Sequence, residues 1–509
     1  MARDDTNSIY YSSDWESRRR RQTGWFNWYS GRELGRKTEE IDPDTDERVG
    51  LWPLEINPIA KACRIHRSVM VGMVDDYAEL PVKIFVKGDD RQVQDFIRGV
   101  WHDSNGAALF QEAALLTQVH GGHAFKVAWE PWNTLLRHRI RVESIQSPWL
   151  YPIFDRTDYW NLRECFIGYP IDAETAESKY SIKANGPDAI YLEHWTKDHY
   201  EITVDGIVPE IEGYGRLEGD HNWGRVPIVY IPHLRDGDFW GRSLVEALVG
   251  LTKEKNARSA DRGDAVREGT HPTLYIRNVT TSIKMKPLQV DGRGNVIKEA
   301  ADLGSAKNMP NSHDPEAGYL GAPNVPQDVI KYDSDLNAEI MNQADVAPVL
   351  VGADDTASGR ITGPVSNMRA VSTVQHCQAE RIEFTTGLIH LTDIILRVAM
   401  GQEQGGQYDA LKVEAPGIVE EHLGYQVGVT WPPMMPIEAM ERTQMLTTRL
   451  QAGGISLESY LRETGCTDVE EEMARIEGDS QRETDRRMQE AEQQAKLKPA
   501  PAQKSGGTK

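Results

Sequence analysis

The sequence contains few cysteines, and their positions exclude the usual disulfide and zinc frameworks. Only 4 cysteines occur in 509 residues, and no two of them form a CxxC pair. A zinc ribbon or a thioredoxin-like redox centre is therefore not indicated. We expect the thiols to be reduced, as is typical of a protein made and used in a cytoplasm or in a particle assembled there. The cysteines are Cys63, Cys165, Cys377 and Cys466.

Long apolar runs and an excess of basic residues are also missing. No segment approaches the roughly 20 apolar residues that a membrane-spanning helix needs, and the N-terminus MARDDTNSIYY lacks the pattern of a signal peptide. The 57 Lys and Arg residues stand against 78 Asp and Glu, which gives a formal net charge of -21. This balance argues against tight wrapping around nucleic acid, although it permits nucleic acid to pass without adhering.

The motifs of common catalytic sites are absent. The sequence has no GxxxxGK[ST], no HExxH and no GxSxG. His120-Gly121-Gly122-His123 offers two metal ligands, but it lies at a helix-to-strand junction without a third ligand nearby, so we interpret it as a turn. Asp354 and Asp355 form the best carboxylate pair, yet a two-metal nuclease would need further acids at strand ends. We therefore predict no enzyme, no catalytic or metal-binding residue and no cofactor.

What is present is the composition of a folded, multidomain chain. Hydrophobic residues make up 39% and charged residues 27% of the sequence, which is ordinary for globular proteins. Apolar spacing predicts three helices, after which the period changes to two and predicts an antiparallel sheet. The helices are expected at Asn57–Tyr77, Gln92–Trp101 and Ala107–His120. The strands are expected at Pro81–Val86, Ala124–Glu130, Leu136–Ile145, Leu162–Ile171, Ala189–Trp195, His199–Val204 and Val226–Ile231. The pattern indicates an α+β domain.

The first 30 residues are polar and aromatic, with a basic run at Arg18–Arg21 followed by Trp25, Phe26, Trp28 and Tyr29. We interpret this segment as a solvated arm whose aromatic residues dock on a neighbouring subunit. The alternative is a nucleic-acid contact by Arg18–Arg21 with stacking aromatic side chains. The tryptophans of the predicted sheet region are interpreted as packing residues, not as a binding cleft.

A single long helix is predicted at Arg242–Glu268. Ser243 with Glu246 has the spacing of a capping box, and Leu244, Leu248 and Leu251 form an apolar stripe in the first half only. The second half is so polar that burial inside one subunit cannot hold it. We therefore expect this helix to be laced by charge pairs or packed against copies of itself, largely exposed in an isolated chain.

The remaining chain reads as further helices separated by loops and short strands. The predicted elements are a strand at Pro272–Asn278, an insert at Thr280–Gln327 with a hairpin at Val290–Ile297, a helix at Asp328–Val346, a loop at Leu350–Pro364, a long helix at Val365–Met400, two or three strands within Leu411–Trp431, helices at Glu438–Ala452, Ser456–Thr464 and Asp468–Glu477, a charged segment at Gln481–Lys496 that could form a frayed helix, and a disordered tail at Lys498–Lys509.

From Asn57 to Gly478 this order of elements resembles the portal proteins of tailed bacteriophages. The residues that carry the resemblance are Gly224–Val229 (GRVPIV) before the first long helix, His271–Ile276 (HPTLYI) after it, Ala347-Pro348 followed by Ser358-Gly359, Gly453–Ser456 (GGIS), and Asp468–Glu472 (DVEEE). The ordered combination, more than any one motif, supports the likeness. The continuation Arg360–Pro364 departs from the family pattern and leaves the limits of the loop open.

The resemblance implies a division of the chain into named regions. These are an N-terminal arm (1–56), a wing (57–241), a first stem helix (242–269), a clip (270–327), a second stem helix (328–346), a tunnel loop (347–364), the long helix and strands of the wing (365–435), a helical crown (436–480) and a charged tail (481–509). The implied fold class is α+β, mostly helical, with an antiparallel sheet in the wing and a small β-containing clip.

The resemblance also implies a function. A portal is a ring, here expected to be a dodecamer, at one capsid vertex, and viral double-stranded DNA passes through it during packaging and ejection. The implied partners are terminase, the head–tail adaptor, and the major capsid and scaffold proteins. The implied DNA-facing residues of the tunnel loop are Asp354, Asp355, Ser358, Arg360 and Thr362. Stem residues expected at subunit contacts or the channel are Lys253, Lys255, Arg258 and Arg262. The alternatives are a metal-dependent nucleic-acid-processing enzyme and a non-portal structural or scaffold protein.

Overall fold

The computed structural model describes residues 9–34, 40–41, 48–49, 56–72, 80–86, 91–155, 158, 161–184, 186–211, 215–235, 239–270, 274–277, 285–290, 296–301, 316–319, 327–352, 370–423, 427–464, 466 and 469–497. These residues form a mixed α+β structure, mostly helical with several antiparallel sheets, which confirms the predicted class. Described residues up to 352 and from 370 to 432 belong to one compact unit, and those from 433 onward to a second.

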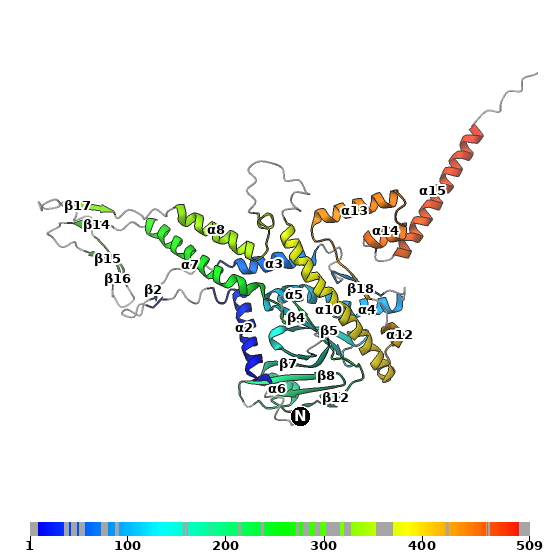
Figure 1. Cartoon of the computed structure of the whole chain (residues 1–509), viewed down its shortest axis with the longest axis horizontal. Helices are drawn as coiled ribbons and strands as arrows, with labels where there is room; N and C mark the ends of the chain where they lie inside the picture. The colour runs from blue at the N-terminus through cyan, green and yellow to red at the C-terminus, as the bar shows by residue number, and fades with distance from the viewer. Residues whose placement is uncertain are drawn as a thin grey trace, which may run out of the picture. The chain divides into compact units, whose positions relative to one another are not determined.

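The two largest sheets of the first unit are both antiparallel (Figure 1). The larger has the strand order β12-β9-β8-β7-β6, and the smaller has the order β13-β4-β5. The strands are β4 (Gly122–Trp129), β5 (Ile140–Gln146), β6 (Leu150–Phe154), β7 (Leu162–Asp172), β8 (Asp188–Thr196), β9 (His199–Val204), β12 (Glu218–Asp220) and β13 (Ile228–Pro232). All six strands predicted between Ala124 and Ile231 are confirmed, with shifted ends. The sequence missed β6, the short β12, and α6 (Ala173–Tyr180), which Asp172 caps through its side chain.

A buried ionic cluster joins the two sheets. Lys126 on β4 places its Nζ 2.8 Å from Glu143 on β5 and 3.1 Å from Glu193 on β8. Glu193 also accepts hydrogen bonds from the Tyr191 hydroxyl at 2.8 Å and the Trp195 indole at 2.6 Å. Because the side chains of Lys126 and Glu193 are only 9% and 6% exposed, each charge depends on the others for its solvation.

Helices cover the sheets, and α10 (Val371–Gln404) is the longest in the first unit. It packs against α3 (Pro58–Val71), β13 and β4. Gly387 lies where α10 crosses β13, and a Cβ there would come within 2.5 Å of the Ile231 side chain. The glycine therefore permits the close approach of helix and strand, although glycine lowers helix propensity by about 1 kcal/mol. The helix predicted to reach Tyr77 ends at Val71, because Gly72 takes a positive φ.

The remaining elements of the first unit are α4 (Arg91–Asp103), α5 (Gly106–His120), α11 (Gln407–Leu411), α12 (Glu420–Leu423), the short 3-10 helices η1 (Ser147–Trp149) and η2 (Pro348–Val351), and the paired strands β1 (Glu40–Ile41) with β2 (Arg48–Val49), β3 (Lys83–Val86) with β18 (Val427–Thr430), and β10 (Glu210–Ile211) with β11 (Gly215–Arg216).

The prediction of two or three strands within Leu411–Trp431 is wrong. Pro416 lacks an N–H and Gly417 has a positive φ, so the segment turns and Ile418 is buried.

The expected solvated arm is also wrong for its central part, because Ser13–Ser30 forms helix α2. Trp15 is 0% exposed and donates from its indole to the Pro148 carbonyl oxygen at 3.1 Å. Gln22 is buried and donates to the Ser147 hydroxyl. Aromatic residues of α2 that were expected to meet a neighbour pack instead on α3, α5 and α7 of the same chain. The mean hydropathy of α2 is low, so the sequence of this segment indicates a polar helix although one side of it is buried.

The long polar helix is α7 (Leu244–Thr270), and it is followed by short strands and by α8 (Gln327–Gln343), which confirms the predicted order. The strands are β14 (Leu274–Arg277) paired with β17 (Glu316–Tyr319), and β15 (Met285–Val290) paired with β16 (Val296–Ala301). The β15–β16 pair confirms the hairpin predicted around residues 290–297. Figure 1 shows α7 and α8 side by side, in agreement with their contacts.

The second unit is helical, as predicted. It contains α13 (Pro436–Gln451), α14 (Leu457–Thr464) and α15 (Val469–Leu497). Glycines follow α13 at residues 453 and 454, and Gly453 has a positive φ, which ends the helix. The charged segment Gln481–Lys496 continues α15 without a break, so the predicted end at Glu477 falls too early.

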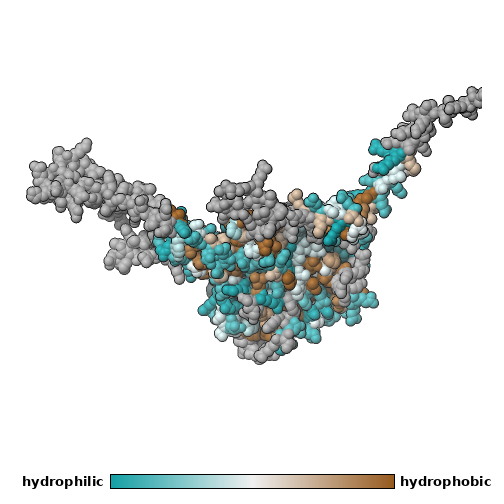
Figure 2. Space-filling view, turned by 45° about the horizontal axis from the view of Figure 1, so that its top comes forward, coloured by the Kyte–Doolittle hydropathy of each residue, from teal (hydrophilic) through white to brown (hydrophobic). Residues whose placement is uncertain are grey.

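On the surface drawn in Figure 2, hydrophilic and hydrophobic residues are interspersed without one broad apolar patch. Large exposed apolar side chains are scattered over separate elements, for example Leu135, Ile382 and Met440. Within the described ranges, no helix has both the length and the apolar character needed to cross a membrane.

Candidate functional site

The polar half of α7 is held by one acidic residue of α8. Asp333 accepts hydrogen bonds from Lys255 at 3.3 Å, Ser259 at 3.2 Å and Arg262 at 3.4 Å. The side chain of Lys255 is 8% exposed, so its ammonium relies on this carboxylate. Helices α7 and α8 therefore form an antiparallel pair whose contact is polar along the second half of α7. The expected charge pairs are present, and Lys255 and Arg262 both pair with Asp333 of the same chain.

The first half of α7 is anchored by apolar contacts. Leu244, Val245 and Leu248 are buried in one cluster with Ile340 and Met341 of α8. Residues of α3 and α5 complete this cluster, namely Ile59, Ala62, Cys63 and Val119. The apolar stripe predicted in the first half of α7 is thus the side of the helix that packs on the body. One face of α7 is thus already buried in a single chain, which corrects the expectation that burial would come only from other copies.

Both helices keep exposed side chains away from their mutual contact. Arg258 is exposed and pairs within α7, with Glu254 at 2.8 Å and Asp261 at 2.9 Å. On α8 the apolar side chains Ile330 and Tyr332 are 50% and 46% exposed. Lys253 is exposed and places its ammonium 5.2 Å from the ring of Trp28. A polar helix pair whose mutual contact is satisfied and whose other sides keep exposed side chains is suited to contact further molecules.

Replacing Asp333 by asparagine should loosen this pair, because it removes the charge that the buried Lys255 ammonium faces. We expect a loss of about 1–3 kcal/mol in the local opening free energy of α7. Amide hydrogen exchange along α7 and α8 in the full chain measures this loss. Asp261→Asn is the matched control, since Asp261 is exposed and its pair should contribute less than about 1 kcal/mol. Equal exchange in the two variants would contradict the assignment.

A buried cluster of three histidines and one glutamate lies where α3, β13 and α10 meet. His66 comes from α3, His233 follows β13, and His376 and Glu380 lie one turn apart on α10. The Nε2 of His233 is 2.5 Å from Oε1 of Glu380 and 3.4 Å from Nε2 of His376. The Nε2 of His376 is 3.5 Å from the same glutamate oxygen.

The outer ring nitrogens of this cluster are occupied by acceptors. Nδ1 of His233 lies 2.6 Å from the backbone oxygen of Arg242, directly before α7. Nδ1 of His376 lies 3.0 Å from the carboxylate of Asp345, directly after α8. Nε2 of His66 lies 2.6 Å from the Ala344 oxygen. The cluster therefore ties the base of the α7–α8 pair to α3 and α10.

The titration of these groups follows from burial and mutual charge. Burial lowers the pKa of His66 to about 4. Burial would raise the pKa of Glu380, but the neighbouring His233 and His376 hold it well below the ordinary range. Burial opposes protonation of His376, yet hydrogen bonds and charge from Glu380 and Asp345 raise its pKa. The site thus keeps Glu380 ionised in a place closed to water.

Sequence reasoning missed this cluster. The only local signal is the spacing of His376 and Glu380, which puts both on one face of a helix. His66 and His233 are far away in the sequence and join only through the fold. His66, His376 and Glu380 offer ligand atoms that all lie within 4.8 Å of one another, and Nε2 of His233 lies beside the ligand atoms of His376 and Glu380.

The candidate ligands His120 and His123 behave as the turn interpretation predicted. Gly121 has a positive φ and a Cβ there would lie 2.9 Å from the Gly241 oxygen, so the turn requires glycine. His123 places Nε2 2.9 Å from the Ser144 hydroxyl, and burial lowers its pKa to about 3. No third ligand joins the two histidines in the part of the chain that is described.

The arginines of α2 are engaged within the chain. The guanidinium of Arg18 lies 3.5 Å from the ring centre of Trp240 and donates to the Leu150 oxygen, and its pKa falls to about 10 through burial. Arg19 lies over Tyr10, and Arg20 pairs with Glu16. A nucleic-acid contact through Arg18 is therefore excluded in this fold, since the side chain is buried.

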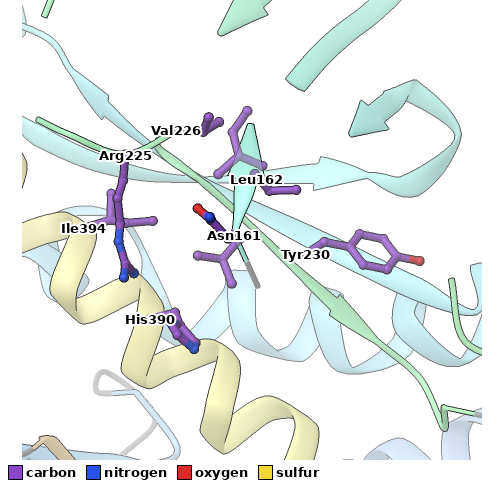
Figure 3. Close-up of a pocket in the computed structure, with 9 residues that line it drawn as sticks. Asn161, Leu162, Arg225, Val226, Tyr230, His390 and Ile394 are labelled. Atoms are coloured by element: carbon purple, nitrogen blue, oxygen red, sulfur yellow. The ribbon is translucent and has the colours of Figure 1, made fainter. Parts of the chain in front are cut away.

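A small cavity lies between β13 and α10 (Figure 3). Arg225, Tyr230, His390 and Ile394 contribute to its wall, and its volume is about 30 Å³. Pockets for small molecules usually measure about 300–1,000 Å³, so this space suits water alone. The proposed tunnel-loop residues Asp354, Asp355, Ser358, Arg360 and Thr362 lie outside the described residues.

Comparisons with known proteins give only distant structural neighbours. No protein-family model matches the sequence, and no curated protein matches it. The chain is similar to a chain in the virion of a native gene transfer agent particle, with 14% identity and a TM-score of 0.39 over 86% of this chain and 93% of that one. It is also similar to a chain in the neck of a native gene transfer agent particle computed with C12 symmetry, with 13% identity and a TM-score of 0.39 over 80% of this chain and 89% of that one. We therefore argue the function of this chain from its own residues.

Proposed function

We propose that the chain is a portal protein, which forms a ring at one capsid vertex of a tailed-phage-like particle and conducts double-stranded DNA in packaging and ejection. Residues 244–270 and 327–343 would be the stem, the strands between them the clip, and the second unit the crown. Terminase and the head–tail adaptor would dock on the clip. The major capsid and scaffold proteins would contact the ring from outside. This ring is expected to be a dodecamer.

The observation that carries the proposal is the α7–α8 pair. The side that joins the two helices is satisfied by Asp333 within one chain, while other sides keep exposed charges and the exposed apolar side chains Ile330 and Tyr332. Exposed polar and apolar side chains on two anchored helices suit packing of one copy beside the next on either side. An overall charge of -21 per chain suits a wall along which DNA slides, because phosphate binding depends on Lys and Arg.

The alternatives have less support. A metal-dependent nuclease would use Asp354 and Asp355, and the sequence offers no further acids arranged for two metals. A non-portal structural protein of a large assembly shares the helical content but leaves the paired stem helices and the intervening hairpins without a role. The nuclease alternative predicts that the purified protein cleaves DNA only when a divalent metal is present.

Negative-stain microscopy of the purified full chain tests the proposal. We expect closed rings with a central channel, and mass photometry should give one dominant oligomer. Ile330→Asp combined with Tyr332→Asp, at two exposed apolar positions of α8, should reduce the ring fraction at least tenfold. Leu135→Asp is the control, because Leu135 is exposed on another element. A monomer at all concentrations for the unaltered chain would refute the proposal.

Replacing Arg360 by alanine should alter DNA movement in an assembled particle. Arg360 is the only Lys or Arg between residues 350 and 364, so a loop that faces the channel would lose its one cation for transient phosphate contact. We expect a measurable change in packaging rate or DNA retention, with a weaker salt dependence. Lys183→Ala, an exposed cation of the body, is the comparison. An Arg360 variant with unaltered packaging and retention would remove this residue from the channel.

A further inference from the structure

We propose that His233, His376 and Glu380 bind a divalent transition-metal ion of the zinc type, which locks the base of the α7–α8 pair to the body of the chain. The site is structural, and it does not depend on the proposed function. It is independent of the four cysteines and of the His120–His123 turn considered above. The observations that carry it are the mutual distances of the three ligand atoms and the partners of the two outer ring nitrogens.

The ligand atoms already have nearly the required spacing. Tetrahedral zinc with nitrogen and oxygen ligands at about 2.0–2.1 Å separates those ligands by about 3.3 Å. The Nε2 atoms of His233 and His376 are 3.4 Å apart, and Nε2 of His376 is 3.5 Å from Oε1 of Glu380. The third separation, from His233 to Glu380, is 2.5 Å and would open by less than about 1 Å on binding.

The outer partners fix the tautomers that metal binding needs. A backbone oxygen and a carboxylate accept hydrogen bonds and donate none at neutral pH. Nδ1 of His233 faces the Arg242 oxygen, and Nδ1 of His376 faces the Asp345 carboxylate, so each Nδ1 carries the proton. When such a ring is neutral, the nitrogen left with a lone pair is Nε2, and the two Nε2 atoms lie 3.4 Å apart. Metal-ligating histidines characteristically donate their second N–H to a carboxylate or a backbone oxygen in this way.

Two adjacent lone pairs beside a carboxylate require a cation between them. A proton can satisfy this by forming a histidinium–glutamate pair, and a divalent ion satisfies all three atoms together. Glu380 and Asp345 supply two negative charges against the two positive charges of the ion, so burial leaves no net charge. The three ligand side chains are 3%, 6% and 2% exposed in the order His233, His376 and Glu380. Such a closed site is typical of structural metals, which keep no position open for substrate.

A fourth ligand is within reach. One ring nitrogen of His66 lies within 4.8 Å of ligand atoms of His376 and Glu380. Nε2 of His66 donates to the Ala344 oxygen, so Nδ1 carries the lone pair, and this nitrogen lies 3.6 Å from Cys377 Sγ. A small movement of this ring would complete a three-histidine, one-glutamate set.

The test uses the full chain without a histidine tag, stripped with a chelator and titrated with Co²⁺. We expect one equivalent per chain, the intense visible absorption of tetrahedral Co²⁺, its loss on addition of Zn²⁺, and a higher melting temperature with either ion. Glu380→Gln and His376→Ala should each abolish saturable binding. Asp345→Asn keeps the left-handed backbone of that position and should weaken binding about 10–100-fold, as loss of an outer partner does.

His194→Ala is the matched control, because it removes a histidine that pairs with a single carboxylate, Glu164, at 3.1 Å and has no second imidazole beside it. This variant should bind Co²⁺ as the unaltered chain does. If the ligand variants do not fold, the Co²⁺ titration of the unaltered chain still shows whether the chain binds a metal ion. Absence of stoichiometric Co²⁺ binding there, with the same melting temperature in Zn²⁺ and in chelator, would overturn the proposal. The cluster would then be a proton-bridged histidine–glutamate pair. Rings that form equally well without metal would leave the proposed function standing.

Discussion

Lys126→Met should lower the free energy of unfolding of the first unit by about 3–5 kcal/mol, because it leaves the buried carboxylate of Glu193 and the partly buried carboxylate of Glu143 without their cation. Glu143 and Glu193 both point at the Lys126 ammonium, and Glu193 is only 6% exposed. The hydrogen bonds that Tyr191 and Trp195 donate would remain, but they cannot neutralise the charge. Methionine matches the length of the lysine stem, so the loss measures charge and not volume.

Urea unfolding followed by tryptophan fluorescence measures this change, since Trp195 lies beside the cluster. Lys183→Met is the matched control, because Lys183 is exposed and the same substitution there should stay within about 0.5 kcal/mol. A Lys126→Met variant as stable as the control would show that the two sheets do not depend on this ion pair.

The pH dependence should follow from the same contacts. Burial would raise the pKa of Glu143, but Lys126 lowers it below the ordinary value. A carboxyl with a lowered folded pKa stabilises the fold above its unfolded pKa, and this stabilisation is lost as pH falls through the folded value. The stability gap between the unaltered chain and Lys126→Met should therefore be largest near neutral pH and shrink below about pH 4. A gap that stays constant from neutral to acidic pH would contradict this.

Leu248→Ala should cost about 2–5 kcal/mol, because it opens a cavity where α7 meets the body. Leu248 is 0% exposed and packs with residues of α3, α5 and α8. The expected result is faster hydrogen exchange along α7 and α8, followed by global destabilisation. If the proposed stem function is right, ring yield should fall as well, since the helix pair would no longer be held at its base.

Leu135→Ala is the control for this prediction. Leu135 is 89% exposed, so the same truncation should change stability by less than about 0.5 kcal/mol. Calorimetry of both variants, together with exchange measurements, separates local from global effects. A Leu248 variant with normal exchange in α7 would show that Asp333 and its partners suffice to hold the pair.

Periodicity predicted the elements that bury one face in the ordinary way. The six strands from Ala124 to Ile231, α5 and α13 all have apolar residues at regular spacing, and the structure contains each of them. The polar helix α7 was also predicted, because its caps and length were visible. Its partner face was not, since a carboxylate such as Asp333 looks like any exposed acid until α8 places it opposite Lys255.

The sequence failed where long-range contacts override local composition. Helix α2 has four consecutive arginines, and nothing in that run shows that Arg18 would be buried against Trp240. In the same way, His66, His233 and His376 are ordinary histidines when read singly. Their meeting depends on the crossing of α3, β13 and α10, and only the His376–Glu380 spacing lies within one element. The strands predicted from residue 411 onward failed for a local reason, because Pro416 and Gly417 interrupt the segment.

The long sequence separations in the body have a consequence for biosynthesis. Strand β3 pairs with β18, so residues near 85 cannot form their strand pairing until residues near 428 have been synthesised. Arg381 on α10 donates to the Met70 oxygen, 311 positions earlier. Contacts between distant segments form slowly, and a chain emerging from the ribosome cannot form them before both partners exist. The nascent chain can therefore complete the first unit only after residue 430 of 509 has been synthesised, which is about five-sixths of the chain.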